Sequence, residues 1–301
     1  MKWEGNRESD NVEDRRGDSD DGGNTGGGGG GGFGGRHIGI GSVVIALVAS
    51  YFFGINPMTV LSLLSGGSAP VTSSQQSQQP QAHRPPANDR ETKFVKTVLG
   101  DTEDVWTEMF RASGKQYVKP VLVIFNNSTS TACGKGETAT GPFYCPVDQK
   151  VYIDLSFYRL MRDRFHVSGE FAQAYVIAHE VGHHVQNLMG ISDKVHEARS
   201  RASQVMGNAL SVRMELQADC FAGVWAFHAN QSRSILESGD VQTALSAATA
   251  IGDDALQRQA QGQVVPDSFT HGTSEQRVRW FSRGLESGKV DQCNTFQAKQ
   301  L

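Results

Sequence analysis

The sequence predicts an α+β protein: a mainly helical domain with a small β-sheet, preceded by one transmembrane helix. Three observations lead to this fold class. Apolar residues recur at helical spacing through long segments of the C-terminal two thirds of the chain. Two short runs rich in β-branched and aromatic residues are typical of strands. A stretch of 18 residues near the N-terminus carries no charge at all.

Charge and length limit the class of protein further. The chain has 301 residues, enough for one generous domain or two small ones. It carries 28 Lys and Arg against 32 Asp and Glu. Residues 1–36 hold eight acidic and five basic side chains, which leaves 24 acidic and 23 basic in the rest of the chain. Such a balance provides no basic field for phosphate backbones, and we expect no nucleic-acid partner.

Residues 1–37 are predicted to form a disordered, glycine-rich cytoplasmic tail. They contain charges of both signs, a glycine run from Gly26 to Gly32 and very few apolar side chains. A segment of this composition cannot bury enough apolar surface to offset the entropy lost on ordering.

Residues 38–64 are predicted to anchor the protein in a membrane. The uncharged run at residues 38–55 would form a helix of roughly 27 Å, about the thickness of the hydrocarbon core. A buried core helix and a cleaved signal peptide are the alternatives, but the flanks are low in complexity and the charged leader is long. Arg15, Arg16 and Arg36 precede the run, which predicts a cytoplasmic N-terminus and a periplasmic domain, with a single pass through the inner membrane. Residues 65–90, rich in Ser, Gln and Pro, are predicted to be a linker.

Residues 91–301 are predicted to form the folded domain. Helical spacing begins at residues 91–113, and strands are expected at Val121–Phe125 and Lys150–Leu155. The remaining pattern is helical, at about 168–189, 193–230, 240–262 and 273–286, with breaks at Gly190, at Gly239 and around Pro266.

The motif H-E-x-x-H is the main chemical feature of the sequence. It is formed by His179, Glu180 and His183. Residues four apart share one helix face, so the two imidazoles can bind one ion, and neutral imidazole suits zinc. Glu180 is rotated by about 100° and can reach a water on that ion without binding it. The alternative is two surface histidines on an amphipathic helix. Gly182 costs about 1 kcal/mol of helix propensity, which suggests close packing there.

A third ligand is expected on a later helix, because two histidines do not hold a zinc ion alone. Glu215 is the best candidate, with a salt bridge to Arg213 or another basic residue as the alternative role. Asp219 lies one turn further along the helix and could accept the free N–H of a ligating histidine, which would orient that ring.

These motifs resemble the gluzincin zinc peptidases and, more closely, the bacterial putative neutral zinc metallopeptidase family. The resemblance rests on five separate segments, GPFYCPVDQKVYIDLSF, AHEVGHHVQ, ELQADCFAGVWA, DSFTHGTSEQRVRWF and DQCNTF. It implies a zincin-like domain with Zn²⁺ as cofactor, held by His179, His183 and Glu215. It also implies hydrolysis of a peptide or protein substrate, with Glu180 as the general base. The alternative is an envelope protein that retains zinc and binds a partner without cleaving it, although such a protein would need no base.

Two further features bear on the expected reaction. The element Thr270-His271-Gly272, followed by Arg277, resembles a Thr-His-Pro…Arg element of gluzincins related to the CAAX-prenyl proteases, with Gly272 in place of the proline. His271 is therefore a candidate catalytic residue that stabilises the oxyanion, and a capping or core role is the alternative. An extended substrate could add to an edge strand, for which Lys150–Leu155 is the candidate, with an ordinary strand of the sheet as the alternative.

The four cysteines predict disulfide bonds. Three pairings are possible. Cys133 and Cys145 flank a loop rich in Gly and Thr, which favours pairing them and leaves Cys220 with Cys293. Four free buried thiols are the alternative. Disulfides would agree with an oxidising compartment.

Overall fold

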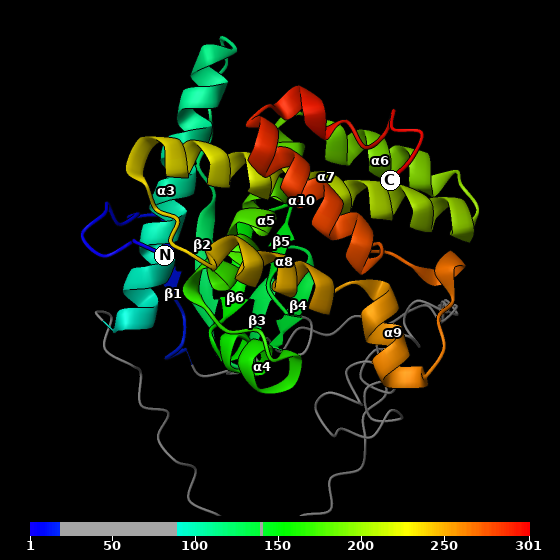
Figure 1. Ribbon diagram of the computed structural model, residues 1–301, viewed down its shortest axis with the longest axis horizontal. Helices are drawn as coiled ribbons and strands as arrows, with labels where there is room; N and C mark the ends of the chain where they lie inside the picture. Colours follow the sequence, from blue (N-terminus) through cyan, green and yellow to red (C-terminus); the bar gives the residue numbers. More distant parts are fainter. Residues whose placement is uncertain (19–88, 139–140) are drawn as a thin grey trace, which may run out of the picture. The chain divides into compact units, whose positions relative to one another are not determined.

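The computed structural model describes residues 1–18, 89–138 and 141–301. In this part of the chain the fold is α+β and mainly helical, as predicted (Figure 1). The helices are α3 (Arg90–Ala112), α4 (Ser156–Phe165), α5 (Glu170–Leu188), α6 (Ile191–Ser200), α7 (Gln204–Arg233), α8 (Asp240–Ala250), α9 (Asp253–Gln261) and α10 (Ser274–Ser287). Two 3₁₀ turns, η2 (Pro266–Ser268) and η3 (Val290–Cys293), complete the helical part.

The main sheet has four strands in the order β1-β2-β6-β5. Strands β1 (Val12–Asp14), β2 (Val121–Phe125) and β6 (Lys150–Asp154) are parallel, and β5 (Phe143–Cys145) runs antiparallel to β6. A separate hairpin pairs β3 (Ser128–Thr131) with β4 (Gly134–Glu137). The two predicted strands form. The expectation that Lys150–Leu155 lies at an edge is wrong, because β6 is hydrogen-bonded to β2 on one side and to β5 on the other.

The helical core is built around α5 and α7, which lie against each other at the centre of the domain (Figure 1). Gly182 of α5 is the point of closest approach: a Cβ there would lie 3.0 Å from the Ala218 carbonyl oxygen of α7. The close packing that Gly182 suggested is therefore present. Helix α10 packs against the next turns of α7, where a Cβ on Gly284 would lie 2.0 Å from the Cys220 carbonyl oxygen.

Two of the predicted helices are each divided in two. The segment 193–230 is split between α6 and α7, where the Ser203 side chain accepts a hydrogen bond from Met206 N and caps α7. The segment 240–262 is split at Gly252, which has no room for a side chain because a Cβ would lie 2.4 Å from Ser274 N. Helix α4 was not predicted.

The prediction that residues 1–37 form a disordered tail is wrong for residues 1–16. Residues 12–14 are strand β1 of the main sheet. Trp3 is only 6% exposed, packs edge-on against Phe94 and donates a hydrogen bond of 2.9 Å to Glu170 Oε2. The amino group of Met1 forms ion pairs of 2.7 Å with Glu237 and 3.1 Å with Asp240.

Polar contacts hold the rest of this N-terminal segment. Arg16 is 5% exposed and is paired with Asp14 and with Asp89, the residue that caps α3. The backbone at Arg7 lies over Gly100 of α3, where a Cβ would come within 2.7 Å of the Arg7 carbonyl oxygen. Composition did not reveal this docking, because a segment that binds to an existing core needs little apolar surface of its own.

Residues 19–37, the apolar segment 38–64 and the linker as far as residue 88 lie outside the described residues. No helix within the described residues combines the length and the apolar character that a membrane crossing requires. Cys133 is bonded to Cys145 and Cys220 to Cys293, which confirms the predicted disulfides. Two disulfides indicate an oxidising, non-cytoplasmic compartment.

Candidate metal centre

Two adjacent helices bring three potential metal ligands together. His179 and His183 project from one face of α5, with ring centroids 4.8 Å apart, and Glu215 comes from α7. One ligand atom from each of the three residues lies within 4.8 Å of the other two. Glu215 Oε2 is 3.2 Å from His179 Nε2, and Glu215 Oε1 is 3.5 Å from His183 Nε2. The sequence-predicted triad is thus assembled in space, with both Nε2 atoms turned toward the carboxylate.

This donor set fits zinc. Two imidazoles and one carboxylate are a ligand set of catalytic zinc sites, in which a water or substrate takes the fourth position. The triad places its nitrogen and oxygen donor atoms around one point, and no other cluster of this kind occurs in the described residues. Glu180 follows His179 directly and is only 7% exposed. Burial raises the pKa of the Glu180 carboxyl.

His179 is held by a buried ionic network. Its Nδ1 lies 2.8 Å from Asp219 Oδ1, and Asp219 is fully buried. Arg277 of α10 donates to both oxygens of Asp219 at 2.9 Å, and the Tyr175 hydroxyl donates to Oδ1 at 2.5 Å. Because the Asp219 carboxylate accepts a hydrogen bond from His179 Nδ1–H, the network orients the imidazole ring so that its Nε2 faces Glu215.

The charges at the site depend on one another. Burial alone would lower the pKa of His179, but the charge of Asp219 and hydrogen bonds from Asp219 and Glu215 raise it to about 10. Burial alone would raise the pKa of Glu215, but the charge of His183 and hydrogen bonds to both histidines lower it well below its usual value. For both residues the neighbouring charges and hydrogen bonds therefore outweigh the effect of burial on the pKa.

His271 lies in the loop before α10 and interacts electrostatically with Glu215. Its position is fixed by Asp253, the first residue of α9. One Asp253 oxygen accepts the backbone N–H groups of Thr270, His271 and Gly272, and the other lies 3.1 Å from His271 Nδ1. The side chain of His271 remains about half exposed.

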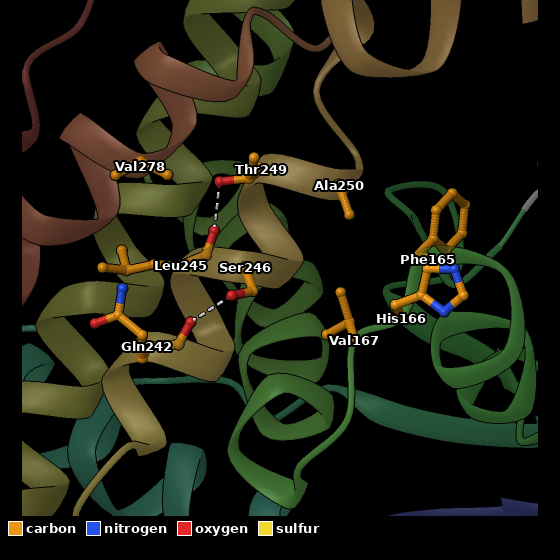
Figure 2. Close-up of a pocket in the computed structure, with 9 residues that line it drawn as sticks. All are labelled: Phe165, His166, Val167, Gln242, Leu245, Ser246, Thr249, Ala250 and Val278. Atoms are coloured by element: carbon orange, nitrogen blue, oxygen red, sulfur yellow. Dashed lines mark hydrogen bonds between the residues drawn. The ribbon is translucent and has the colours of Figure 1, made fainter. Parts of the chain in front are cut away.

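Other features flagged in the sequence lie apart from the triad. His184 points away from it and contacts the Tyr144 hydroxyl and the Val118 carbonyl, a structural role. Arg213 binds the carbonyl oxygens of Thr295 and Ala298 rather than Glu215. A hollow between Phe165–Val167 and α8 includes none of the triad residues (Figure 2).

Sequence reasoning missed four residues that support the site: Tyr175, Gln186, Gln217 and Asp253. Tyr175 lies four residues before His179, and Gln186 three residues after His183, so helical spacing alone could have indicated both. Gln217 and Asp253 carry no such signal, because their partners lie on distant segments.

Comparison with known proteins agrees with this geometry. A family model described as "Putative neutral zinc metallopeptidase" matches residues 1–296. The chain is 51% identical to "Uncharacterized protein YpfJ" of Escherichia coli K12, over 98% of this chain and 99% of the relative. It is 41% identical to "Uncharacterized protein Rv2575" of Mycobacterium tuberculosis H37Rv, over 62% of this chain and 65% of the relative. No solved structure matches the chain.

Proposed function

The chain belongs to the "putative neutral zinc metallopeptidase" family, which implies Zn²⁺ as cofactor, and from this premise we propose that it hydrolyses peptide bonds. In this proposal His179, His183 and Glu215 hold the zinc ion. The observation that carries the proposal is that one ligand atom from each of these three residues lies within 4.8 Å of the other two, while Glu180 is buried next to His179 in the chain and need not bind the metal.

Each residue has a defined task in this reaction. Bound zinc supplies Lewis-acid activation, which lowers the pKa of water from 15.7 to about 7. Glu180 takes the proton from the attacking water and returns it to the leaving amine. His271, held by Asp253, donates a hydrogen bond to the developing oxyanion.

The substrate strand is proposed at β5 rather than at Lys150–Leu155. Among the described residues β5 is a terminal strand of the main sheet, and an extended peptide can add to such an edge. Strand β5 also lies next to the metal-site helix, since the Tyr144 hydroxyl contacts His184 and accepts a hydrogen bond from Asn187. A peptide added there would run beside α5.

The experiment is to measure zinc content and cleavage of a mixed peptide library by wild type, Glu180→Gln and His183→Ala. We expect Glu180→Gln to keep one zinc per chain and to lose cleavage by at least a hundredfold. His183→Ala should lose the zinc. Unchanged turnover in Glu180→Gln would reject the base. A zinc-loaded wild type that cleaves nothing in the library would favour a binding protein instead.

For location, we propose that residues 38–64 hold the protein at a membrane, with residues 1–16 and 90–301 together on its non-cytoplasmic side. The support is β1, which is paired with β2 over Val12–Asp14. Two paired strands of one sheet cannot lie on opposite sides of a bilayer, so residues 12–14 and 121–125 share one side of any membrane. The expectation of a cytoplasmic N-terminus rested on Arg36, which lies outside the described residues, and on Arg15 and Arg16, which are both ion-paired within the fold.

Labelling with a membrane-impermeant maleimide tests this arrangement. The exposed positions Asp10 and Glu286 would each be changed to Cys, in separate variants, and cells with permeabilised outer layers would be treated before and after lysis. We expect both positions to react before lysis. Labelling of Glu286→Cys alone would place the N-terminus across the membrane and reject the proposal.

A further inference from the structure

The two histidines of the site are oriented by chemically different partners. His179 Nδ1 faces the carboxylate of Asp219. His183 Nδ1 faces a neutral amide instead, the Gln186 Oε1 atom at 2.9 Å. Gln186 is fully buried, so its amide has no access to water and each of its polar atoms needs a partner in the protein.

A chain of amides runs inward from Gln186. Its Nε2 donates to the Met214 carbonyl at 2.7 Å and to Gln217 Oε1 at 3.1 Å. The Nε2 atom of Gln217 donates in turn to the Cys293 carbonyl at 2.9 Å. Gln217 is 5% exposed, so the whole chain is buried.

The direction of this chain is fixed at its far end. A backbone carbonyl can only accept, so the amino groups of Gln217 and Gln186 must point toward Cys293 and Met214. The Gln186 Oε1 atom then faces His183 Nδ1. Because this oxygen can only accept a hydrogen bond, Nδ1 must carry the proton. Turning either amide over would set two acceptors against each other and break two buried hydrogen bonds, at about 1–3 kcal/mol for each group left unpaired. His183 is therefore held with Nδ1 protonated, and its Nε2 lone pair is available to a metal ion.

The final acceptor is itself held by a covalent bond. Cys293 ends the short turn η3, and its disulfide to Cys220 ties that turn to α7. Gln217 and Cys220 lie three residues apart on α7, on the same face. The disulfide thus fixes the distance between the Gln217 amide and the carbonyl that it binds.

We propose that Gln186 and Gln217 are positioning residues that hold His183 in its metal-binding tautomer, and that the Cys220–Cys293 disulfide supports them by fixing the last acceptor. The inference rests on the zinc site of the proposed function but not on peptide hydrolysis. Metal affinity should consequently depend on the redox state of this disulfide.

Zinc affinity, measured by competition with a chromophoric chelator, tests the amide chain. We expect Gln186→Met to weaken zinc binding 10- to 100-fold and Gln217→Met about tenfold, in keeping with the effect of outer-shell partners in other sites. Gln173→Met, a change of the same kind at a partly exposed position of α5, is the matched control and should leave the affinity within twofold. An unchanged affinity in both Gln186→Met and Gln217→Met would overturn the proposal.

A second measurement reports the tautomer directly. In ¹⁵N spectra of the zinc-loaded wild type, His183 should show a protonated Nδ1 and a metal-bound Nε2, and Co²⁺ spectra of Gln186→Met should shift relative to wild type. A metal-bound Nδ1 at His183 would overturn the proposal, whatever the activity. Failure of hydrolysis with these signatures intact would reject the proposed function alone.

The disulfide is tested by comparing two pairs of substitutions. Cys220→Ala with Cys293→Ala should weaken zinc binding about tenfold, whereas Cys133→Ala with Cys145→Ala, which frees the hairpin loop, should not. Equal affinities in the two folded variants would reject the role of Cys220–Cys293. If the first pair does not fold, the contribution of the last acceptor is decided by Gln217→Met.

Discussion

Changing Gly182 to Ala should loosen the metal site although Gly182 binds nothing. The glycine lies between the two histidines of α5 and touches α7 at Ala218. An added Cβ would lie 3.0 Å from the Ala218 carbonyl oxygen and 3.1 Å from its Cα atom. These are backbone atoms, which cannot move without moving α7. Restoring ordinary contact distances requires the helices to separate by about 0.5 Å.

Two opposing terms set the stability of this variant. Alanine gains about 1 kcal/mol of helix propensity over glycine, and overpacking costs about 1–3 kcal/mol. Gly207→Ala is the matched control, because Gly207 is a helical glycine of α7 with only the Arg199 side chain, at 4.0 Å, near the added Cβ. Gly207→Ala should gain the stability that comes from helix propensity without the steric clash that Gly182→Ala introduces. The free energy of unfolding of the two variants should therefore differ by about 1–3 kcal/mol, the cost of the clash alone.

Urea denaturation of the metal-free proteins gives this difference, and chelator competition gives the zinc affinity. A separation of α5 from α7 moves Glu215 away from both histidines, so Gly182→Ala should bind zinc at least tenfold more weakly than wild type. Gly207→Ala should bind zinc like wild type. A Gly182→Ala protein that is as stable as Gly207→Ala and binds zinc normally would refute the close approach as the feature that sets the site.

Three further predictions follow from buried contacts. Arg277→Met should lower the free energy of unfolding by about 3–5 kcal/mol in urea titrations, because it removes the guanidinium that donates to both oxygens of the buried Asp219 carboxylate, and an unchanged midpoint would contradict this. Burial alone would raise the pKa of Asp219, but the charge of Arg277 lowers it to about 2. The ionised carboxylate therefore adds about 2 kcal/mol to the free energy of unfolding above pH 4, and this contribution is lost as the pH falls toward 2. The difference in stability between wild type and Asp219→Asn should shrink over that range. Trp3→Ala should cost about 3 kcal/mol of unfolding free energy, whereas a disordered N-terminus would make the change silent.

The closeness of the two histidines could be predicted because their geometry is local. His179 and His183 lie one turn apart, and any helix through them places both rings on one face. The apolar run at Val121–Phe125 is likewise a strand by composition alone. The close packing at Gly182 could also be predicted from the sequence, because a glycine in the middle of a helix lowers stability unless a neighbouring element needs the space.

The remaining features depend on contacts between distant segments. Residues 1–16 have the composition of a disordered tail, and they are ordered because a sheet edge and the side of α3 are there to receive them. Strand β6 is interior only because β5 pairs with the side that β2 leaves open.

The sequence by itself determined which side chains could bind zinc, because helical periodicity is a property of neighbouring residues. Only the tertiary structure decided how those side chains are held. Asp219, Arg277, Gln217 and the Cys293 carbonyl reach the histidines across helix contacts, and hydrogen-bond direction in a buried network is set by partners that the local sequence does not contain.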